Sequence, residues 1–369
     1  MRSLSLDVVI ATRNRPDALA LSIPLILGQG RPPDRLVIVD SSDDHAAVQA
    51  AVAGATRGWT GPVRLLRSEA GLTRQRNIGL REVTADIVLF PDDDSMLYPG
   101  TIAEILAVYG RDTGGRIAGV CTATAPLPPE GFGIPGFDMG SDPDTPPTAN
   151  RYSVPAEMRR QMRSVPLKNR LRRRFNALDP IFYVGQSLMA QATPLPWFAD
   201  ANCRLVEVMG GYRMSFRTDI ARRIGFNETL GAYAHCEDYD ASFAAARHGL
   251  IVGARNARIH HHKYPSGRGS AFRQGAMRML NTAYVVLRHS GPGPTPPTRD
   301  RAAALLRRFA LAYPLLSLPS LRHGRGRDFL AGFRAGARGL EGLIAADAGG
   351  LDAAYTGAMQ RALGDRPQP

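Results

Sequence analysis

The first 90 residues of the chain alternate short apolar runs with segments of helical composition. Each apolar run is rich in Val, Ile or Leu and ends in polar residues. The runs are Leu6–Ala11, Leu36–Val39, Val63–Leu66 and Ile87–Phe90, and the segments between them are Asp17–Leu27, Asp44–Arg57 and Leu72–Val83. Strands that alternate with helices at this spacing form βαβ units. We therefore predict an α/β fold with a mainly parallel sheet flanked by helices.

Polar side chains follow three of these predicted strands at the point where each strand ends. Thr12, Arg13 and Asn14 follow the first strand, Asp40, Ser41 and Ser42 the second, and Asp92, Asp93 and Asp94 the fourth. Ligands of such sheets bind beyond the carboxyl ends of the strands. The sequence thus predicts a nucleotide site with an acidic rim.

The composition favours a folded protein with an anionic partner. Hydrophobic residues make up 44% of the 369 residues, which excludes wholesale disorder. The net charge of +13 suits nucleotide phosphates, nucleic acid or a membrane surface. Three scattered cysteines argue against a disulfide scaffold or a thiolate zinc site. No run approaches the roughly 20 apolar residues that span a bilayer, and the N-terminal run is too short for a signal peptide.

The second half of the chain divides at a Pro- and Gly-rich breaker, GPGPTPP, which begins at Gly291. Residues 121–157 are also rich in Pro and Gly, and we predict a long loop there. Residues 159–174 carry eight basic and no acidic residues. Beyond the breaker the chain is rich in Ala, Leu and Arg, and we predict helices to about residue 347.

The sequence IVLFPDDDS delivers three consecutive aspartates to the end of a buried strand. Mg²⁺ and Mn²⁺ prefer oxygen ligands and are often held by one or two carboxylates plus substrate phosphates. Asp92 and Asp94 lie two residues apart, so they point to the same side of an extended segment. A solvated turn is the alternative, and the preceding buried strand makes it the weaker one.

Three further sets of residues could each have a functional role or a purely structural one. Glu237 and Asp238, in CEDYDASF, could accept a proton from a hydroxyl or could stabilise the first turn of a helix. The run His260–His262 could bind a metal, although a His run in a loop is more often incidental. Arg76 could hold a nucleobase or phosphate with its planar guanidinium or could lie on a polar helix face.

In combination, these segments resemble the GT-A fold family 2 glycosyltransferases. The resemblance extends over residues 5–262 and is carried, in family order, by LDVVIATRNRPDALALSIPLILGQGRPPDRLVIVDSSDD, GLTRQRNIGLREVTADIVLFPDDDS, MGGYRMSFRTDIARRIGFNETLGAYAHCEDYDASFAAARHGL and ARIHHH. The tail piece FLAGFRAGARGL resembles the end of bacterial members that build surface polysaccharides. The usual acidic pair after the second strand is reduced here to Asp40, Ser41 and Ser42.

The resemblance implies which residues bind the donor. Thr12 and Arg13 would line the nucleotide site, and Asp40 would bind the nucleobase. Arg76 would contact the base or the diphosphate. Gly211 would permit a close approach of the backbone to donor or acceptor.

The resemblance also implies the metal and catalytic residues. In the DxD region, Asp92 would approach the ribose or sugar, with Asp93 beside it, and Asp94 would bind the metal. His261 best matches the family's metal-binding histidine, although His260 or His262 could be the counterpart. Asp238 would be the general base, with Glu237 next to it.

The resemblance and the breaker divide the chain into a GT-A domain over residues 1–290 and a helical basic tail over residues 291–369. Within the first, residues 1–120 would bind the nucleotide sugar, residues 121–205 would form a variable insertion, and residues 206–290 would carry the acceptor and catalytic part. The implied activity is an inverting, Mg²⁺- or Mn²⁺-dependent transfer of a sugar from a UDP- or dTDP-sugar to a hydroxyl. The acceptor would be a glycan or lipid-linked glycan in polysaccharide synthesis for the cell envelope.

The basic segment and the tail predict a cytoplasmic enzyme attached peripherally to the anionic inner face of the plasma membrane. Two rival interpretations are weaker. A sugar nucleotidyltransferase should carry a Gly-rich GxGTRL-type loop after the first strand, where this chain has ATRNRP. A non-catalytic basic protein would bind nucleic acid or membrane, but we find no nucleic-acid-binding module and expect no nucleic-acid partner.

Overall fold

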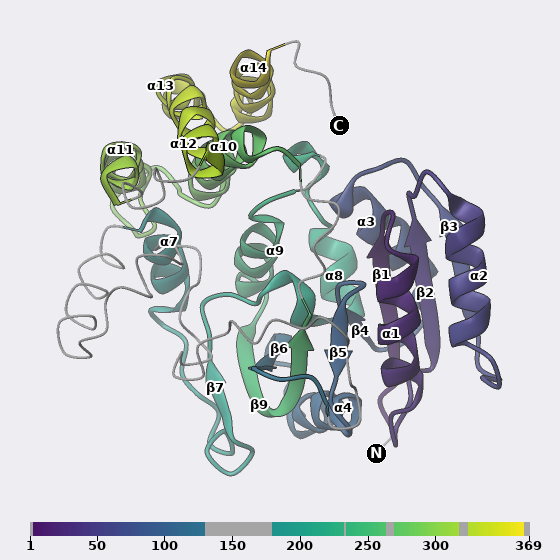
Figure 1. Ribbon diagram of the computed structural model, residues 1–369. Coiled ribbons are helices and arrows are strands. Elements are labelled where there is room, and N and C mark those ends of the chain that lie inside the picture. Colours follow the sequence, from purple (N-terminus) through teal and green to yellow (C-terminus); the bar gives the residue numbers. More distant parts are fainter. Residues whose placement is uncertain (1–2, 130–178, 232–233, 263–268, 317–323, 365–369) are drawn as a thin grey trace. The chain divides into compact units, whose positions relative to one another are not determined.

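The computed structural model describes residues 3–129, 179–231, 234–262, 269–316 and 324–364 (Figure 1). These residues form two compact units. The first unit comprises the described parts of Met1–Pro147 and Ala192–Arg268, and the second comprises those of Thr148–Gln191 and Gly269–Pro369.

The first unit is built on a nine-stranded sheet with the order β3-β2-β1-β4-β8-β6-β9-β5, in which β7 also pairs with β9. The strands are β1 (Leu6–Thr12), β2 (Arg35–Asp40), β3 (Val63–Arg67), β4 (Ile87–Phe90), β5 (Ser95–Leu97), β6 (Ile117–Ala125), β7 (Cys203–Leu205), β8 (Met214–Arg217) and β9 (Leu250–His261). The predicted α/β class is confirmed, and β1 to β4 are parallel as expected. The sheet is mixed beyond them, because β8 runs antiparallel to both β4 and β6.

Helices cover both faces of this sheet (Figure 1). They are α1 (Pro16–Leu27), α2 (His45–Ala55), α3 (Leu72–Glu82), α4 (Thr101–Arg111), α8 (Thr218–Ile224) and α9 (Glu237–Ala246). Side chains of α1, α2 and α4 pack with Val8 and Ile10 on one face, and those of α3, α8 and α9 pack with Val9 on the other. Burial on both faces is what makes the strands near-continuous apolar runs.

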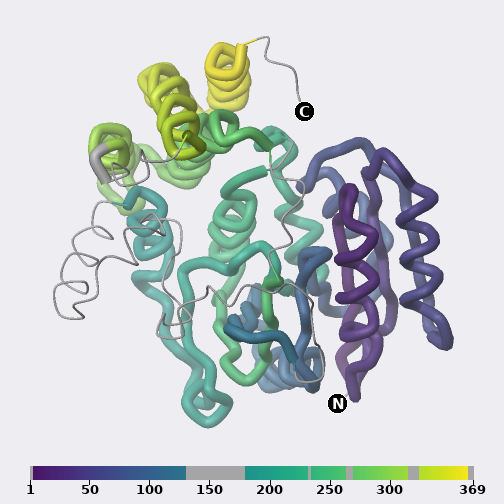
Figure 2. The backbone as a smooth tube through the Cα atoms, viewed as in Figure 1, coloured from purple at the N-terminus to yellow at the C-terminus, as the bar shows by residue number. Residues whose placement is uncertain are grey.

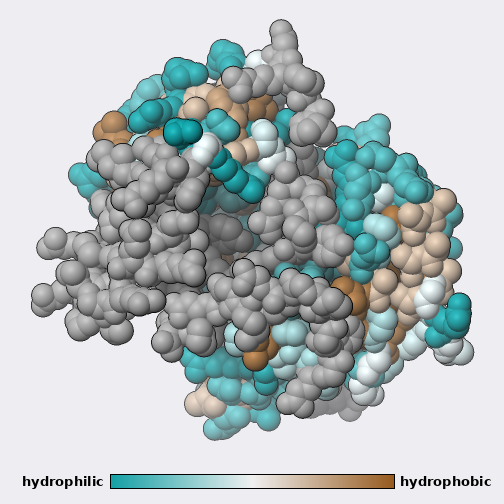
Figure 3. All heavy atoms as spheres, viewed as in Figure 1, coloured by the Kyte–Doolittle hydropathy of each residue, from teal (hydrophilic) through white to brown (hydrophobic). Residues whose placement is uncertain are grey.

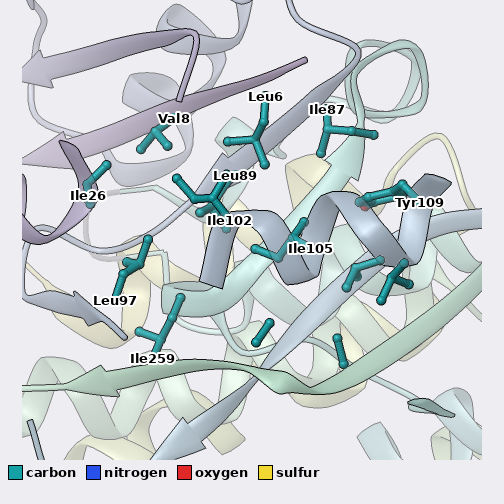
Figure 4. Packing of buried hydrophobic residues seen from close by; sticks show 14 of the residues in the cluster. Leu6, Val8, Ile26, Ile87, Leu89, Leu97, Ile102, Ile105, Tyr109 and Ile259 are labelled. Atoms are coloured by element: carbon teal, nitrogen blue, oxygen red, sulfur yellow. The ribbon is translucent and has the colours of Figure 1, made fainter. Parts of the chain in front are cut away.

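The core under α4 shows this packing at close range (Figure 4). Leu6, Leu89 and Ile105 lie together in one cluster of buried side chains. On the opposite face α3 approaches so closely that a Cβ added at Gly79 would lie 2.3 Å from a methyl carbon of Val9. Among the described residues, the only exposed large hydrophobic side chains are those of Leu127 and Leu311. Hydrophilic side chains accordingly cover most of the described surface visible in Figure 3.

Strand β6 differs from the sequence-based expectation. Residues 121–125 were expected to begin a long loop, but they continue β6 between β8 and β9. The stretch GVCTATA consists of small residues, so it lacks the Val- and Ile-rich signature by which the other strands were recognised. The remainder of the predicted loop and the basic segment 159–174 lie outside the described residues.

The second unit is helical (Figure 2). Its helices are α7 (Pro180–Met189), α10 (Ala271–Arg288), α11 (Arg299–Leu316), α12 (Gly324–Ala337), α13 (Leu340–Ala345) and α14 (Leu351–Leu363). Helix α10 is buried from Gly275 to Leu287 and groups with this unit, although the sequence analysis assigned it to the first domain. Helical structure also extends past residue 347, through α14. No described helix is both long enough and apolar enough to cross a membrane.

Candidate functional site

The acidic run and the histidine run meet because of one strand pairing. Strand β4 is fully buried and ends at Phe90, so the chain emerges at its carboxyl end as Asp92–Asp94. It then turns into β5, which pairs antiparallel with the end of β9. In that register Ser95 lies opposite His261, directly after Asp94. Two segments more than 160 residues apart in sequence are therefore brought to one point.

Asp92, Asp94 and His261 form a group of three potential metal ligands. Their ligand atoms lie within 4.8 Å of one another. Nε2 of His261 is 3.2 Å from Oδ1 of Asp94 and 3.8 Å from Oδ2 of Asp92. Two carboxylates and one imidazole are a donor set that suits Mn²⁺ or Mg²⁺ with open positions for substrate oxygens. The residues present therefore fit a divalent cation.

The neighbouring histidines face elsewhere, as strand alternation requires. The Nδ1 atom of buried His260 lies 3.1 Å from the carbonyl oxygen of Ala125. Burial lowers the pKa of His262, against the opposing effect of Asp94. Only His261 of the three belongs to the described group of potential metal ligands.

Asp93, the middle residue of the run, points away from this group. Its carboxylate accepts hydrogen bonds from Oγ1 of Thr12 at 2.9 Å and from Nη1 of Arg15 at 3.0 Å. Burial and the nearby Asp94 raise the pKa of Asp93 to about 7. Thr12 and Asp93 were both expected to bind donor; the structure places them in a buried link between the ends of β1 and β4.

Arg76 joins three segments that the sequence analysis had identified separately. Its Nη1 donates to Oε1 of Glu237 at 2.7 Å, and its Nη2 donates to Oδ1 of Asp92 at 3.1 Å and to the carbonyl oxygen of Gly211 at 2.9 Å. The residue is only 1% exposed. Arg76 thus ties the metal-ligand group to the acidic pair of α9 and does not face solvent.

Glu237 and Asp238 occupy the first turn of α9 and are both buried. Oδ2 of Asp238 accepts from the backbone N–H of Gly211 at 3.2 Å, and Oδ1 accepts from that of Tyr239 at 3.0 Å. Burial raises the pKa of both carboxyls, and for Glu237 the proximity of Asp238 adds to the effect while Arg76 opposes it. The pair therefore includes groups that can take up a proton near neutral pH.

Gly211 was expected to let the backbone approach donor or acceptor closely. In the structure, the group that it approaches is a protein side chain. A Cβ added there would lie 2.6 Å from Oε1 of Glu237. The absence of a side chain lets the Gly211 backbone bond to both Arg76 and Asp238.

Asp40 lies at the end of β2 and is fully buried. Its Oδ1 accepts from the backbone N–H of Ser42 at 2.7 Å, and its Oδ2 lies 2.5 Å from Nδ1 of His45 and 3.1 Å from Nη1 of Arg67. Although burial alone would raise it, the hydrogen bonds from Ser42 and His45 hold the pKa of Asp40 below its ordinary value. The more accessible groups at this position are His45 and Arg67.

Arg13 is the predicted donor-binding residue with the most accessible side chain, at 49% exposure. The loop that carries it is fixed by Asn14, which adopts a left-handed backbone conformation with φ of 55°. Nδ2 of Asn14 donates to the carboxylate of Asp43, and the backbone N–H of Asp43 donates back to Oδ1 of Asn14. These two bonds join the loops that follow β1 and β2.

Sequence reasoning missed several residues that shape the site: Arg15, His45, Arg67, Ser95 and Tyr212. The signal for Arg15 was its place in ATRNRP, just after Thr12. Ser95 directly follows the acidic run, and Tyr212 follows Gly211. His45 and Arg67 become visible only once Asp40 is known to be buried, because nothing in their sequence neighbourhood marks them.

Comparison with known proteins finds a family match in the N-terminal part of the chain. The profile of Glycosyl transferase family 2 matches residues 7–124, which span β1 to the end of β6. That range contains Thr12, Asp40, Arg76 and the acidic run. No curated protein matches the sequence.

Several solved structures are similar to the whole chain or to most of it. The mannosyltransferase PcManGT from Pyrobaculum calidifontis, in complex with GDP-Man and Mn²⁺, is 17% identical with a TM-score of 0.53; the match covers 100% of this chain and 89% of that one. S. aureus TarS 1–349 is 13% identical with a TM-score of 0.45, covering 97% and 90%. GalNAc-T7 with UDP, GalNAc and Mn²⁺ is 14% identical with a TM-score of 0.49, covering 77% and 48%. The likeness to PcManGT shows the GT-A fold.

Proposed function

We propose, from the match of residues 7–124 to Glycosyl transferase family 2, that this chain is a glycosyltransferase that moves a sugar from a nucleoside diphosphate sugar to a hydroxyl with inversion. One observation carries the proposal. The candidate metal ligands Asp92, Asp94 and His261 and the acidic pair Glu237 and Asp238 lie in one unit and are bridged by Arg76. Such a site has one part for a leaving diphosphate and one for an incoming hydroxyl.

Asp92, Asp94 and His261 would hold a divalent cation, Mn²⁺ or Mg²⁺. A bound cation neutralises negative charge that develops on the departing diphosphate. The protein's own contribution is to keep the three ligand groups together. Asp94 is fixed between His261 and Arg15, whose Nη1 lies 3.7 Å from Oδ2 of Asp94. Asp92 is fixed by Arg76.

Asp238 would act as the general base. The acceptor hydroxyl attacks the anomeric carbon from the side opposite the diphosphate, its proton passes to the Asp238 carboxylate, and the bond from carbon to diphosphate oxygen breaks. A single displacement of this kind inverts the anomeric centre. The two backbone N–H groups bonded to Asp238 orient its carboxylate, while Glu237 is engaged with Arg76.

The donor-binding residues divide into two kinds in this proposal. Arg13 is exposed and can meet a phosphate directly. Thr12, Asp40 and Asp93 are buried and bonded within the protein, so they act by shaping the pocket. A UDP or dTDP donor, a glycan or lipid-linked acceptor, and attachment to the inner face of the plasma membrane stay predictions from the sequence.

Nucleotide and metal binding test the proposal directly. In a thermal-shift screen of UDP, dTDP and GDP and their sugars, we expect a rise in melting temperature that requires Mn²⁺. A ligand present at 100 times its Kd stabilises the folded state by about 2.7 kcal/mol. The rise should be lost in Asp94→Ala, because one of three ligand groups is removed, and kept in Asp200→Ala, which changes an exposed carboxylate. Absence of any nucleotide effect, or an unchanged effect in Asp94→Ala, would contradict the proposed site.

The pH dependence of turnover tests the role of Asp238. Burial raises the pKa of Asp238 to about 6. A base must be deprotonated to work, so activity is present above this pKa and is lost as the pH falls through it. We expect kcat/KM to decrease about tenfold per pH unit below about pH 6. A profile that stays flat between about pH 4 and about pH 7 would show that Asp238 is not the base.

A further inference from the structure

The ring of Tyr212 lies flat against the ring of His261. The two ring centroids are 4.4 Å apart and the ring planes differ by 16°. Tyr212 is the middle residue of the short 3-10 helix η1 (Gly211–Arg213) and follows the glycine that bonds to Asp238. An aromatic side chain from the acidic-pair side of the site thus touches a candidate metal ligand on β9.

Tyr212 is itself held at two points. Its hydroxyl is hydrogen-bonded to Oγ1 of Thr124 on β6. Its carbonyl oxygen accepts from Oγ of Ser95 at 3.2 Å, and the same Ser95 Oγ accepts from the backbone N–H of Asp92 at 3.0 Å. Tyr212 therefore contacts His261 through its ring and connects to Asp92 through Ser95.

The orientation of a metal-binding imidazole depends on what supports its ring. Such a histidine almost always donates its second ring N–H to a carboxylate, a carbonyl or water, which fixes the ring orientation. Nε2 of His261 faces Asp92 and Asp94. Within the described parts of the chain, no protein group is hydrogen-bonded to Nδ1 of His261. The stacked ring of Tyr212 contacts one face of this imidazole.

We propose that Tyr212 is a positioning residue that holds the His261 imidazole in its metal-binding orientation by ring stacking. The inference rests on the proposed metal site at Asp92, Asp94 and His261. In this proposal the planar ring of Tyr212 orients the imidazole, as a hydrogen bond to Nδ1 does in other metal sites. The ring of Tyr212 carries this role, and its hydroxyl is not required for it.

The test uses the full-length protein and Mn²⁺ alone, without donor or acceptor. Free Mn²⁺ is measured by its EPR signal, and coupling of the bound ion to histidine nitrogen is measured by pulsed EPR. Removal of groups that orient a metal ligand typically weakens metal binding by about 10- to 100-fold. We expect a weakening in this range for Tyr212→Leu, together with loss of the nitrogen coupling. Tyr212→Phe keeps the ring, so it should keep the nitrogen coupling and lose less than about tenfold in affinity.

Tyr98→Leu is the matched control, because the Tyr98 ring packs on the guanidinium of Arg258 and not on a candidate ligand. If Tyr212→Leu does not fold, Tyr212→Met, which fills similar volume without a planar face, takes its place. Wild-type affinity and nitrogen coupling in the Leu or Met variant would overturn the inference, as would equal losses in Tyr212→Phe and Tyr212→Leu.

His261→Ala separates failure of the inference from failure of the proposed function. If the parent protein binds no Mn²⁺, or if His261→Ala binds it with unchanged affinity, the metal site itself is wrong. If His261→Ala binds Mn²⁺ weakly while Tyr212→Leu binds it normally, the site stands and the role of Tyr212 is wrong.

Discussion

Replacing Asp238 with Asn is expected to lower kcat by about 10²- to 10⁴-fold, the usual contribution of a general base. The amide keeps the shape of the side chain, so its oxygen can still accept a backbone N–H, but it cannot take the acceptor's proton. Donor binding should persist, because the candidate metal ligands lie on other segments. Steady-state kinetics of Asp238→Asn, with a nucleotide thermal shift on the same sample, measures both quantities.

Asp219→Asn provides the matched control for this change. Asp219 also lies in the first turn of a helix, α8, but its side chain is exposed. We expect this variant to turn over at the parent rate. Near-parental turnover in Asp238→Asn would remove Asp238 as the base and would direct attention to Glu237. A parallel loss of nucleotide binding would instead indicate that Asp238 maintains the pocket.

The second large effect is expected in the helical unit, from Gly332→Ala. A Cβ added at Gly332 on α12 would lie 1.8 Å from the carbonyl oxygen of Phe272 on α10, and one added at Gly275 would lie 1.9 Å from that of Phe329. Both contacts are with backbone atoms, so no side chain can rotate away and the helices must separate. Overpacking of this kind costs about 1–3 kcal/mol, occasionally more. Urea denaturation, with hydrogen exchange of α10 and α12, measures the loss.

Gly342→Ala is the control for the intrinsic effect of the substitution. Apart from its chain neighbours and the backbone of its own helix, α13, nothing lies within 4 Å of a Cβ added at Gly342. There the higher helix propensity of Ala should increase the free energy of unfolding by up to about 1 kcal/mol. Equal stability of Gly332→Ala and the parent protein would mean that α10 and α12 do not need their close approach.

The alternating segments predicted much of the first unit because each element carries its own local pattern. The strand Ile87–Phe90 has the same bounds in sequence and structure, and the helix predicted over Leu72–Val83 ends one residue earlier, at Glu82. The acidic run was also predictable as part of the site, since it directly follows a buried strand. Asp92 and Asp94, two residues apart, do lie together in the described group of potential metal ligands.

What could not be predicted depends on pairings between distant segments. Nothing near Asp40 indicates that Arg67, which lies 27 residues further along the chain, donates to its carboxylate. Arg76 has the sequence environment of an exposed polar helix, yet it is buried between Asp92 and Glu237. Burial of an arginine is tolerated when carboxylates surround it. The sequence around Arg76 does not reveal these carboxylates, because they belong to other elements.

The short helix η1 links the acidic pair to the candidate metal ligands. Gly211 is bonded to Asp238, and the next residue, Tyr212, stacks on His261. Consecutive Cα atoms across a trans peptide are about 3.8 Å apart, so covalent geometry sets the spacing between the anchor of the base and the anchor of the imidazole. Motion elsewhere in the chain leaves that spacing unchanged. Insertion of a single residue between Gly211 and Tyr212 would therefore separate the two anchors and disturb both parts of the site at once.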